Sequence, residues 1–369
     1  MKIERIEAIA ISIPLNKTFS GSSYQVTHRA TVVTRIHTES GLVSEIYNGD
    51  EREHGAEIAR IIEEEMAPLL VGDSIFAWER SWEKLFRMTI RAAHRPLVMQ
   101  AIACVDAAIW DLMGKALGVN VCRLLGGYRE EVPIIAIAGY YLPGKTPRDL
   151  APEMEWLRSV GMAGCKVKVG GATPEVDAER VRYAREGGGA DFLIAVDANR
   201  GWSVEEASRF ARLVEPYDIA WFEEPCHWHD DARGMAQVRR ATSIPINAGQ
   251  SEVSGAGIRR LLDASAVDIV NFDASEGGGI TEWRRVAAAC ALQGVRMAHH
   301  EEPQIASHMI GAVPHGICVE CFPDPDRDPI FPGMWVNPPK IHEGILSIPQ
   351  GPGFDVRLDW DMIRRYRIN

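Results

Sequence analysis

The sequence predicts an α/β protein in which a closed parallel barrel of β/α units follows an α+β domain. The chain has 369 residues, which is too long for one small domain and enough for a barrel of about 250 residues with a second domain. Beyond residue 125, short apolar runs alternate with amphipathic helical stretches, a pattern typical of a parallel sheet. Eight such runs fill a closed barrel more naturally than an open sheet.

Residues 1–125 predict the α+β domain. Two segments, IEAIAISIPL and ATVVTRIHT, alternate apolar with polar residues as half-buried strands do, and the polar segment NKTFSGSSYQVTHR between them predicts a flexible loop. From Glu53 the spacing becomes helical, in AEIARIIEEEMAPLLVG, SWEKLFRMTIR and PLVMQAIACVDAAIWDLMGKALG. The last stretch ends on a glycine, which is a usual helix stop.

Residues 126–345 predict the barrel. The eight strand candidates are IIAIAGYY, GCKVKVG, FLIAVDAN, IAWFEEP, IPINAGQ, VDIVNFDAS, VRMAHH and ICVECF. Helical stretches such as PEVDAERVRYAREG, SVEEASRFARLVE and ITEWRRVAAACALQG lie between them, so each belongs to one β/α unit. The Pro/Gly-rich stretch GILSIPQGPGFDVRL introduces the last segment, residues 346–369, which we expect to fold back on the first domain.

Composition argues against several partners. The net charge of −11 disfavours nucleic acid, since phosphate binding needs a basic patch. No apolar run reaches the roughly 18 residues of a membrane span, and the N-terminus lacks the uninterrupted apolar core of a signal peptide. We therefore expect a cytoplasmic protein without a membrane partner. The seven cysteines are scattered; Cys318 and Cys321 match C-x-x-C, but no second pair completes a zinc site, which predicts reduced, mostly buried thiols.

Polar side chains follow seven consecutive strand candidates. One acid at a strand end is usually a helix cap, and a lysine there normally reaches water. Seven in order must converge at the carboxyl ends of the strands, where barrel enzymes carry their sites, and so much buried charge needs a cation and a substrate to compensate it. These residues are Lys166 and Lys168, Asp197 and Asn199, Glu223 and Glu224, Gln250 and Glu252, Asp273, His299 and His300, and Glu320.

One part of this ring predicts a metal beside a base. Asp197 and Glu223 are hard oxygen ligands on adjacent strands, which suits Mg²⁺. Lys166 and Lys168 lie on one face of their strand because the side-chain period is two. Two neighbouring lysines predict a lowered pKa for one of them, and a lysine that is neutral near pH 7 is a competent general base.

The opposite part of the ring predicts a second acid/base group. Asp273 lies one strand from His300, and a carboxylate that holds one imidazole nitrogen orients the other for proton transfer. A metal flanked by two bases suits removal of the proton next to the carboxylate of a small anionic substrate, with Mg²⁺ stabilising the enediolate.

Taken in order, K-x-K, D-A-N, E-E-P, an Asp, a His-bearing strand and a final Glu resemble the mandelate racemase group of the enolase superfamily, over nearly the whole chain. The resemblance implies an N-terminal α+β capping domain, a modified TIM barrel of the (β/α)7β type and a C-terminal return. It also implies a homo-oligomer, commonly an octamer or a dimer.

The resemblance assigns roles to the matching positions. His300 is preferred to His299 because it falls at the strand end, where the family's base lies, and His299 would then face the other way. The implied roles are Mg²⁺ ligation by Asp197 and Glu223, acid/base catalysis by Lys168 with Lys166 tuning it and contacting the substrate carboxylate, an opposing dyad of Asp273 and His300, and a hydrogen bond from Glu320 to the carboxylate.

One position departs from the family pattern. The third metal ligand is normally an acid at the end of the fifth strand, where this chain has Gln250 in A-G-Q-S-E. Three interpretations stay open: Gln250 coordinates through its carbonyl oxygen, Glu252 on the same face reaches back to the metal, or metal binding is impaired.

The same residues support different reactions. The preferred interpretation is dehydration of an acid sugar to a 2-keto-3-deoxy acid, with His300 as the acid for the departing water. Racemisation or epimerisation of a 2-hydroxy acid by two bases is the alternative, and a non-catalytic relative is a further one. A nucleotide-binding module is disfavoured, since no G-x-G-x-x-G follows a strand.

Substrate contacts are expected from loops. Asn199, two residues past a metal ligand, is one candidate. Segments 16–29 and 48–54 are candidate specificity loops of the first domain, in which Tyr24, His28 and His54 would close over a polyol. Segment 227–231 either binds substrate or caps the next helix, and the sequence does not separate these two possibilities.

Overall fold

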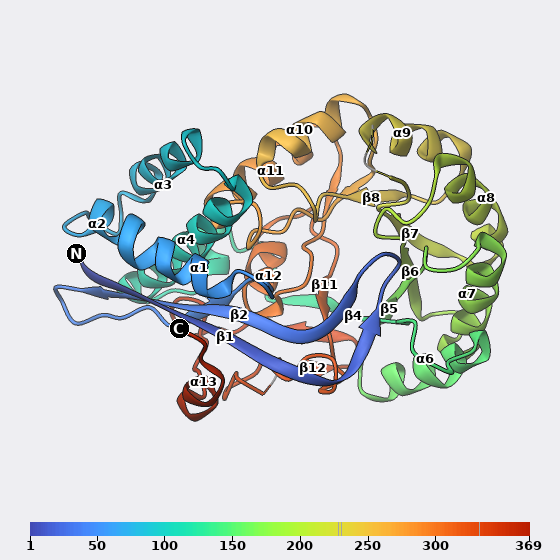
Figure 1. The fold of residues 1–369 in the computed structure, drawn as a ribbon, viewed down its shortest axis with the longest axis horizontal. Coiled ribbons are helices and arrows are strands. Elements are labelled where there is room, and N and C mark those ends of the chain that lie inside the picture. Colours follow the sequence, from blue (N-terminus) through green and yellow to red (C-terminus); the bar gives the residue numbers. More distant parts are fainter. Residues whose placement is uncertain (228, 230, 332) are drawn as a thin grey trace.

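The computed structural model describes residues 1–227, 229, 231–331 and 333–369. Figure 1 shows a barrel surrounded by helices and, beside it, a smaller sheet covered by helices from the N-terminal third of the chain. A long hairpin runs from the smaller sheet towards the barrel strands β4 and β5. The predicted order of an α+β domain followed by a β/α barrel is confirmed.

The N-terminal sheet is antiparallel, in the order β1 (Ile3–Ser20), β2 (Gln25–Thr38) and β3 (Ile46–Asn48). Its two long strands are the predicted ones, but the predicted loop 16–29 is wrong. Pairing of β1 with β2 continues to Phe19 opposite Val26, and both side chains are buried. Burial of this apolar pair extends the ladder, so only residues 21–24 form the turn.

The N-terminal helices follow the predicted apolar spacing. Helix α4 ends at Gly118, whose φ of 69° is left-handed as a helix-terminating glycine requires. By length and composition α4 could cross a membrane, but its most apolar window is entirely buried inside the fold, so it is a core helix. The segments are α1 (Gly55–Arg60), a π-helical segment (Ile61–Met66), α2 (Ala67–Leu70), α3 (Trp78–Phe86), a 3₁₀ segment (Arg87–Ile90), α4 (Arg95–Leu117) and α5 (Val121–Leu125).

All eight predicted barrel strands are present and parallel. They pair in chain order, and the last strand pairs with the first, which closes the barrel. A single bridge between Met297 and Gly316 joins the seventh strand to the segment before the eighth. The strands are β4 (Glu131–Ala138), β5 (Gly164–Lys168), β6 (Leu193–Asp197), β7 (Ile219–Glu223), β8 (Ile246–Ala248), β9 (Ile269–Val270), β10 (Arg296–Met297) and β11 (Val319–Cys321).

Helices surround the barrel between successive strands. Two of these helices begin with side-chain caps: Ser203 and Glu206 form a capping box on α8, and Thr173 caps α7. Helix α12 differs from the others because all ten of its residues are buried. The helices are α6 (Leu150–Ser159), α7 (Pro174–Gly188), α8 (Val204–Val214), α9 (Asp231–Ala241), α10 (Gly255–Asp263), α11 (Ile280–Leu292) and α12 (Pro303–Ala312), with 3₁₀ turns at Pro147–Asp149 and Glu215–Tyr217.

Side-chain alternation separates the barrel interior from the helix-facing surface. A small apolar cluster that includes Ala195 and Trp221 takes one residue from each of several strands. Asp197 and Glu223 lie two residues further along the same strands and therefore point to the same side. The apolar cluster thus fills the barrel beneath a polar ring at the carboxyl ends of the strands.

The end of the chain returns to the N-terminal domain. Strand β13 (Ile345–Ser347) pairs with β4 and with β12 (Ile341–His342). Helix α13 (Trp360–Tyr366) then leads to Ile368, whose N–H donates to the carbonyl of Ala10 in β1 at 3.0 Å. As predicted, the seven cysteines are free thiols, and all of them are buried.

Candidate active site

The carboxyl ends of the barrel strands bring together a ring of buried ionisable side chains. Lys166, Lys168, Asp197, Glu223 and Glu320 are at most 2% exposed. Each comes from a strand position whose inward direction is set by the two-residue period. Burial of this much charge is tolerated only when the groups pair with one another, and the contacts below show that they do.

Both lysines of β5 form short ion pairs. Lys168 Nζ donates to Asp197 Oδ2 at 2.6 Å and to Asn199 Oδ1 at 3.2 Å. Lys166 Nζ donates to Glu223 Oε1 at 2.6 Å and lies 2.8 Å from Glu320 Oε1. These pairs hold the ammonium groups in place and order one side of the ring.

The prediction of a lowered lysine pKa is wrong for this structure. Burial lowers the pKa of Lys166, but the carboxylates of Glu223 and Glu320 outweigh it and raise that pKa. Burial likewise lowers the pKa of Lys168, and Asp197 reverses the effect. The like charge of the other lysine contributes less than the carboxylate that each lysine contacts.

The donor set around Glu223 fits a hard divalent cation. Burial raises the pKa of Glu223 well above its ordinary value against the effect of Lys166, and the charges of Asp197 and Glu320 add to the rise. Such crowding of buried carboxylates is relieved by a cation. Gln250 Oε1 is buried and, among the described residues, meets no hydrogen-bond donor, so it is an oxygen available for a ligand.

Gln250 and Glu252, the two candidates for a third metal-binding oxygen, differ in how far their side chains are already engaged. Glu252 pairs with Arg260 at 3.0 Å and lies 3.9 Å from Arg200, so its carboxylate is already engaged. Gln250 donates from Nε2 to Glu224 Oε2 at 3.3 Å, which leaves its carbonyl oxygen without a partner in the described chain. The described residues hold no group of three or more His, Cys, Asp or Glu side chains arranged for a metal.

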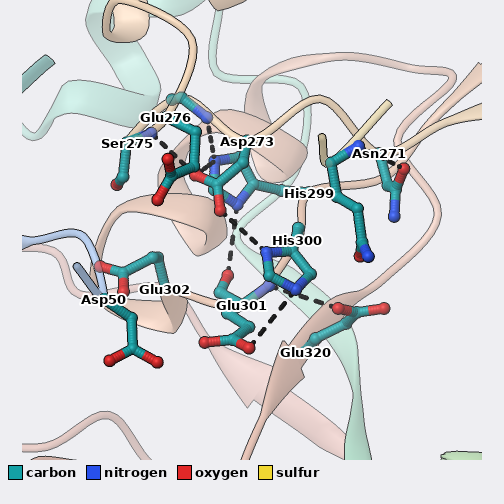
Figure 2. Close-up of polar contacts among 12 residues, drawn as sticks. Asp50, Asn271, Asp273, Ser275, Glu276, His299, His300, Glu301, Glu302 and Glu320 are labelled. Carbon is teal, nitrogen blue, oxygen red and sulfur yellow. Dashed lines mark hydrogen bonds and ion pairs between the residues drawn. The ribbon is translucent and has the colours of Figure 1, made fainter. Parts of the chain in front are cut away.

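His300 lies between two carboxylates at the ends of β9 and β10. Its Nδ1 is 2.9 Å from Asp273 Oδ2, and its Nε2 is 3.4 Å from Glu301 Oε1 (Figure 2). Burial and then the positive charges of Lys166 and Lys168 lower the pKa of His300 well below its ordinary value. Burial raises the pKa of Asp273 well above its ordinary value. The 2.9 Å hydrogen bond places one hydrogen between Asp273 Oδ2 and Nδ1 of the ring.

His299 has a different environment. Its Nε2 accepts from the N–H of Ala274 at 2.9 Å, so Nδ1 carries the hydrogen that it donates to the carbonyl of Glu301 at 3.2 Å. Burial lowers the pKa of His299 to about 4. Both ring nitrogens are thus engaged by the backbone, and the ring serves to hold two loops together.

A pocket of about 400 Å³, within the size range of small-molecule sites, lies beside the ring, where Asn199, Glu224 and Gln250 after β6, β7 and β8 line it. The turn of the β1–β2 hairpin covers it, and the ring of Tyr24 lies 5.8 Å from Lys168 Nζ. Ser22 Oγ reaches the carbonyl of Asn199 at 3.4 Å. The pocket is lined by Ser22, Ser23, Tyr24, Asn199, Arg200, Gly201, Glu224, His227, Gln250 and Ser251.

Not every candidate substrate contact reaches this pocket. Tyr24 and Asn199 line it, whereas His28 and His54 do not. His28 is exposed on β2, 2.9 Å from Thr27 Oγ1, and His54 precedes α1, 3.4 Å from Glu57. In the segment 227–231, residues Trp228 and Asp230 lie outside the described part of the chain; His227 lines the pocket, and Asp231 is an ion-pair partner of Arg260 and Arg200.

Two family models match the chain. Residues 6–126 match the N-terminal domain of the mandelate racemase / muconate lactonizing enzyme family, and residues 149–362 match the enolase C-terminal domain-like family. The chain belongs to the mandelate racemase subgroup of the enolase superfamily. The expected fold, a capping domain with a modified TIM barrel, is thereby confirmed.

Relatives within this superfamily are enzymes of two classes. D-Galactarolactone cycloisomerase of Agrobacterium fabrum is 29% identical over 100% of this chain and 99% of its own. Arabinonate dehydratase of Saccharolobus solfataricus is 31% identical over 91% of this chain and 90% of its own. A crystal structure of a mandelate racemase/muconate lactonizing enzyme from a marine actinobacterium, in complex with magnesium, is 44% identical, covers 100% of this chain and 99% of its own, and superposes with a TM-score of 0.93.

The structure also reveals a buried cluster around Arg29 that the sequence analysis missed. The guanidinium of Arg29, in β2, lies 2.9 Å from Asp50, 3.2 Å from Asp328 and 3.4 Å from Glu302, with Glu301 at 3.7 Å. It joins the capping domain to the loops after β10 and β11. The partners are far apart in sequence, so no local pattern announces them; the acid pair after His299–His300 was the available signal.

Proposed function

We propose that this protein catalyses Mg²⁺-dependent removal of the α-proton of a hydroxy-carboxylate, and that the reaction is dehydration of an acid sugar to a 2-keto-3-deoxy acid. The observation that carries the proposal is the arrangement of two different proton-transfer groups on one ring. Lys168 lies on β5, and the pair of His300 and Asp273, joined at 2.9 Å, comes from the ends of β10 and β9. The dehydratases among its relatives support the same reaction class.

The metal would be held by Asp197, Glu223 and the carbonyl oxygen of Gln250, with Glu252 as the alternative to Gln250. When bound there, Mg²⁺ would supply positive charge that stabilises the negative charge developing on the substrate carboxylate. The magnesium complex of the marine actinobacterial relative supports this cofactor.

Lys168 is the proposed base. Burial by itself lowers the pKa of Lys168, and the Asp197 carboxylate is what raises it, so the amine becomes a competent base once Asp197 is engaged as a ligand. Lys166 and Glu320, paired at 2.8 Å, would hold the substrate carboxylate in place. The α-carbon loses its proton to Lys168 Nζ, and the electron pair moves into the enediolate.

His300 is the proposed acid. The enediolate expels the hydroxyl on the next carbon, and His300 Nε2 protonates that oxygen so that it leaves as water. The enol that remains tautomerises to the 2-keto-3-deoxy acid. Serine, asparagine and tyrosine side chains around the pocket offer hydrogen bonds to a hydroxylated chain, so Asn199 and Tyr24 are the proposed substrate contacts.

Racemisation or epimerisation is the second candidate, and the same two proton-transfer groups favour it. If the substrate lacks a hydroxyl on the next carbon, His300 would return a proton to the face opposite Lys168. The cycloisomerase among its relatives belongs to the same isomerase class. A non-catalytic protein is the remaining alternative, for which Gln250 in place of an acid is the only sequence feature.

Proton NMR tests the proposal directly. We would incubate the protein with Mg²⁺ in D₂O against a panel of aldonic, aldaric and uronic-derived acids. A 2-keto-3-deoxy product is the expected result and identifies the substrate. Exchange of the α-proton without loss of water would establish a racemase or epimerase instead. The proposal would be contradicted if no acid in the panel exchanged its α-proton, provided that calorimetry shows that the same preparation binds Mg²⁺.

A further inference from the structure

The imidazole of His300 has a second acidic neighbour, on the nitrogen opposite Asp273. Figure 2 shows the ring between the two carboxylates, with a contact from each nitrogen. Glu301 Oε1 lies 3.4 Å from Nε2, and Asp273 Oδ2 lies 2.9 Å from Nδ1. Nε2 is the nitrogen that would face a substrate, so Glu301 occupies the acceptor position that a substrate oxygen would take.

The backbone of Glu301 is held in an unfavourable conformation. Its φ is 52°, and that of Glu302 is 57°, a left-handed region that residues other than glycine rarely adopt. Two hydrogen bonds fix it: the Glu301 N–H donates to Glu320 Oε2 at 3.3 Å, and His299 donates to the Glu301 carbonyl at 3.2 Å. Such strain persists where the surrounding structure imposes it, and here it aims the carboxylate at His300.

Surrounding charge keeps the Glu301 carboxylate ionised although it is buried. Burial raises its pKa, but positive charges led by Arg29 outweigh that effect and lower it. An ionised carboxylate accepts hydrogen bonds only, so its negative charge, 3.4 Å from Nε2, favours the tautomer that carries the hydrogen on that nitrogen. Titratable and charged groups face the Glu301–His300 pair from every neighbouring element. They are Arg29, Asp50 and Arg52 from the capping domain, Lys166, Lys168 and Asp197 from β5 and β6, Asp273 and Glu276 after β9, His299 and Glu302 after β10, Glu320 in β11, and Arg327 and Asp328 after β11.

We propose that Glu301 is a positioning residue that fixes the exchangeable proton on Nε2 of His300, so that this imidazole meets its substrate as an acid. The inference rests on the proposed function and deepens it, because it favours water loss over racemisation. When the departing hydroxyl displaces Glu301, the Nε2–H bond breaks and an O–H bond forms on the leaving oxygen. The bond between this oxygen and its carbon breaks at the same time, and the hydrogen between Asp273 Oδ2 and Nδ1 moves onto Nδ1, so the ring ends neutral and the step is balanced.

The first test needs no substrate. Histidine ring nitrogens are observed by ¹⁵N NMR, in the solid state if the particle is large, and the His300 signals are assigned from their loss in His300→Asn. We expect Nε2 to be protonated in the wild type and the Nδ1-protonated form to increase in Glu301→Gln, an isosteric neutral change. Glu302→Gln is the matched control, because Glu302 also pairs with Arg29, whereas in the described part of the chain the carboxylate beside Nε2 of His300 is that of Glu301. Unchanged His300 signals in Glu301→Gln would overturn the inference.

The second test separates the two proton transfers. With a substrate that the protein dehydrates, Glu301→Gln should lower kcat for water loss by about tenfold or more. The alkaline limb of the pH profile of kcat should move to lower pH. The α-proton exchange that depends on Lys168 should stay within about twofold, KM should change little, and Glu301→Asp should restore part of kcat. Equal loss of exchange and water loss would mean a merely structural role. If no acid is turned over, the proposed function fails while the NMR result still decides this inference.

Discussion

Gln250 is the residue at which this chain differs most from its superfamily's pattern. Its Nε2 donates to Glu224 Oε2 at 3.3 Å, while its Oε1 accepts no hydrogen bond from the described residues. We predict that Gln250→Glu increases Mg²⁺ affinity about tenfold, or about 1.4 kcal/mol, because a carboxylate adds charge to the ligand set. The same change should destabilise the metal-free protein, since it places two carboxylates together.

Titration calorimetry with Mg²⁺, and thermal unfolding with and without EDTA, measure both effects. Glu252→Gln is the control: its pair with Arg260 is lost, but Mg²⁺ affinity should stay within about twofold of the wild type. If Mg²⁺ affinity changes in Glu252→Gln and stays within about twofold in Gln250→Glu, then Glu252 and not Gln250 supplies the third oxygen.

At the residue scale, the sequence predicts which side chains point into the barrel, because that depends on the local two-residue period. It does not predict their pKa values, because these depend on which residues the fold brings together. The strand-end residues from Lys166 to Glu320 followed from the two-residue alternation of each strand. The direction of the lysine pKa did not, because it depends on which carboxylate each ammonium group contacts. Arg29 and Glu301 were missed for the same reason: their partners come from other elements.

At the element scale, the β1–β2 hairpin carries the capping domain to the site. Its ladder continues beyond the predicted strands, and the turn places Tyr24 over Lys168. The eight barrel strands were predictable from their apolar runs, whereas this extension was not, since polar residues around Phe19 and Val26 hide the alternation. Helix α12 was also not identified, because it has only ten residues and all of them are buried, so the sequence shows few turns and no polar face.

We predict that Tyr24→Ala raises KM about tenfold with a smaller change in kcat. The ring supplies one wall of the pocket, 5.8 Å from the Lys168 ammonium group, so its removal takes away contacts with the substrate. A tenfold change in KM corresponds to about 1.4 kcal/mol. Steady-state kinetics on the substrate found by the NMR panel provides the measurement. His28→Ala on the same hairpin should leave KM unchanged, because His28 does not line the pocket. A larger KM effect from His28 than from Tyr24 would contradict this assignment.

At the scale of the whole molecule, Asp106 joins the two domains. It lies in α4 of the capping domain and accepts from the N–H of Thr281 at 2.9 Å and from its hydroxyl at 2.6 Å, at the start of barrel helix α11. Trp110 donates to the same hydroxyl at 3.1 Å. Burial raises the pKa of Asp106 to about 7 against the effect of the Thr281 hydrogen bonds, so the domain contact should depend on pH.

The sign of this dependence follows from proton uptake. The ordinary pKa of Asp106 is 3.8 and its folded value is about 7, so folding takes up a proton between these pH values. The contribution of Asp106 to stability therefore decreases as pH rises through that window, by at most about 1.4 kcal/mol per pH unit. Asp106→Asn cannot take up this proton. At pH 4, where the wild-type carboxyl is protonated in the fold, the variant should be less stable than the wild type. By pH 8 this difference in the free energy of unfolding should be smaller.

Unfolding midpoints of the wild type and of Asp106→Asn, measured by calorimetry at pH 4, 6 and 8, test this. The control is Asp263→Asn, at an exposed position in α10. The difference in unfolding midpoint between this variant and the wild type should not follow the same pH dependence. If the difference in unfolding midpoint between Asp106→Asn and the wild type is the same at all three pH values, Asp106 stays ionised in the folded protein. The junction between capping domain and barrel would then be held by hydrogen bonds from Thr281 to a charged carboxylate, and its strength would not weaken towards neutral pH.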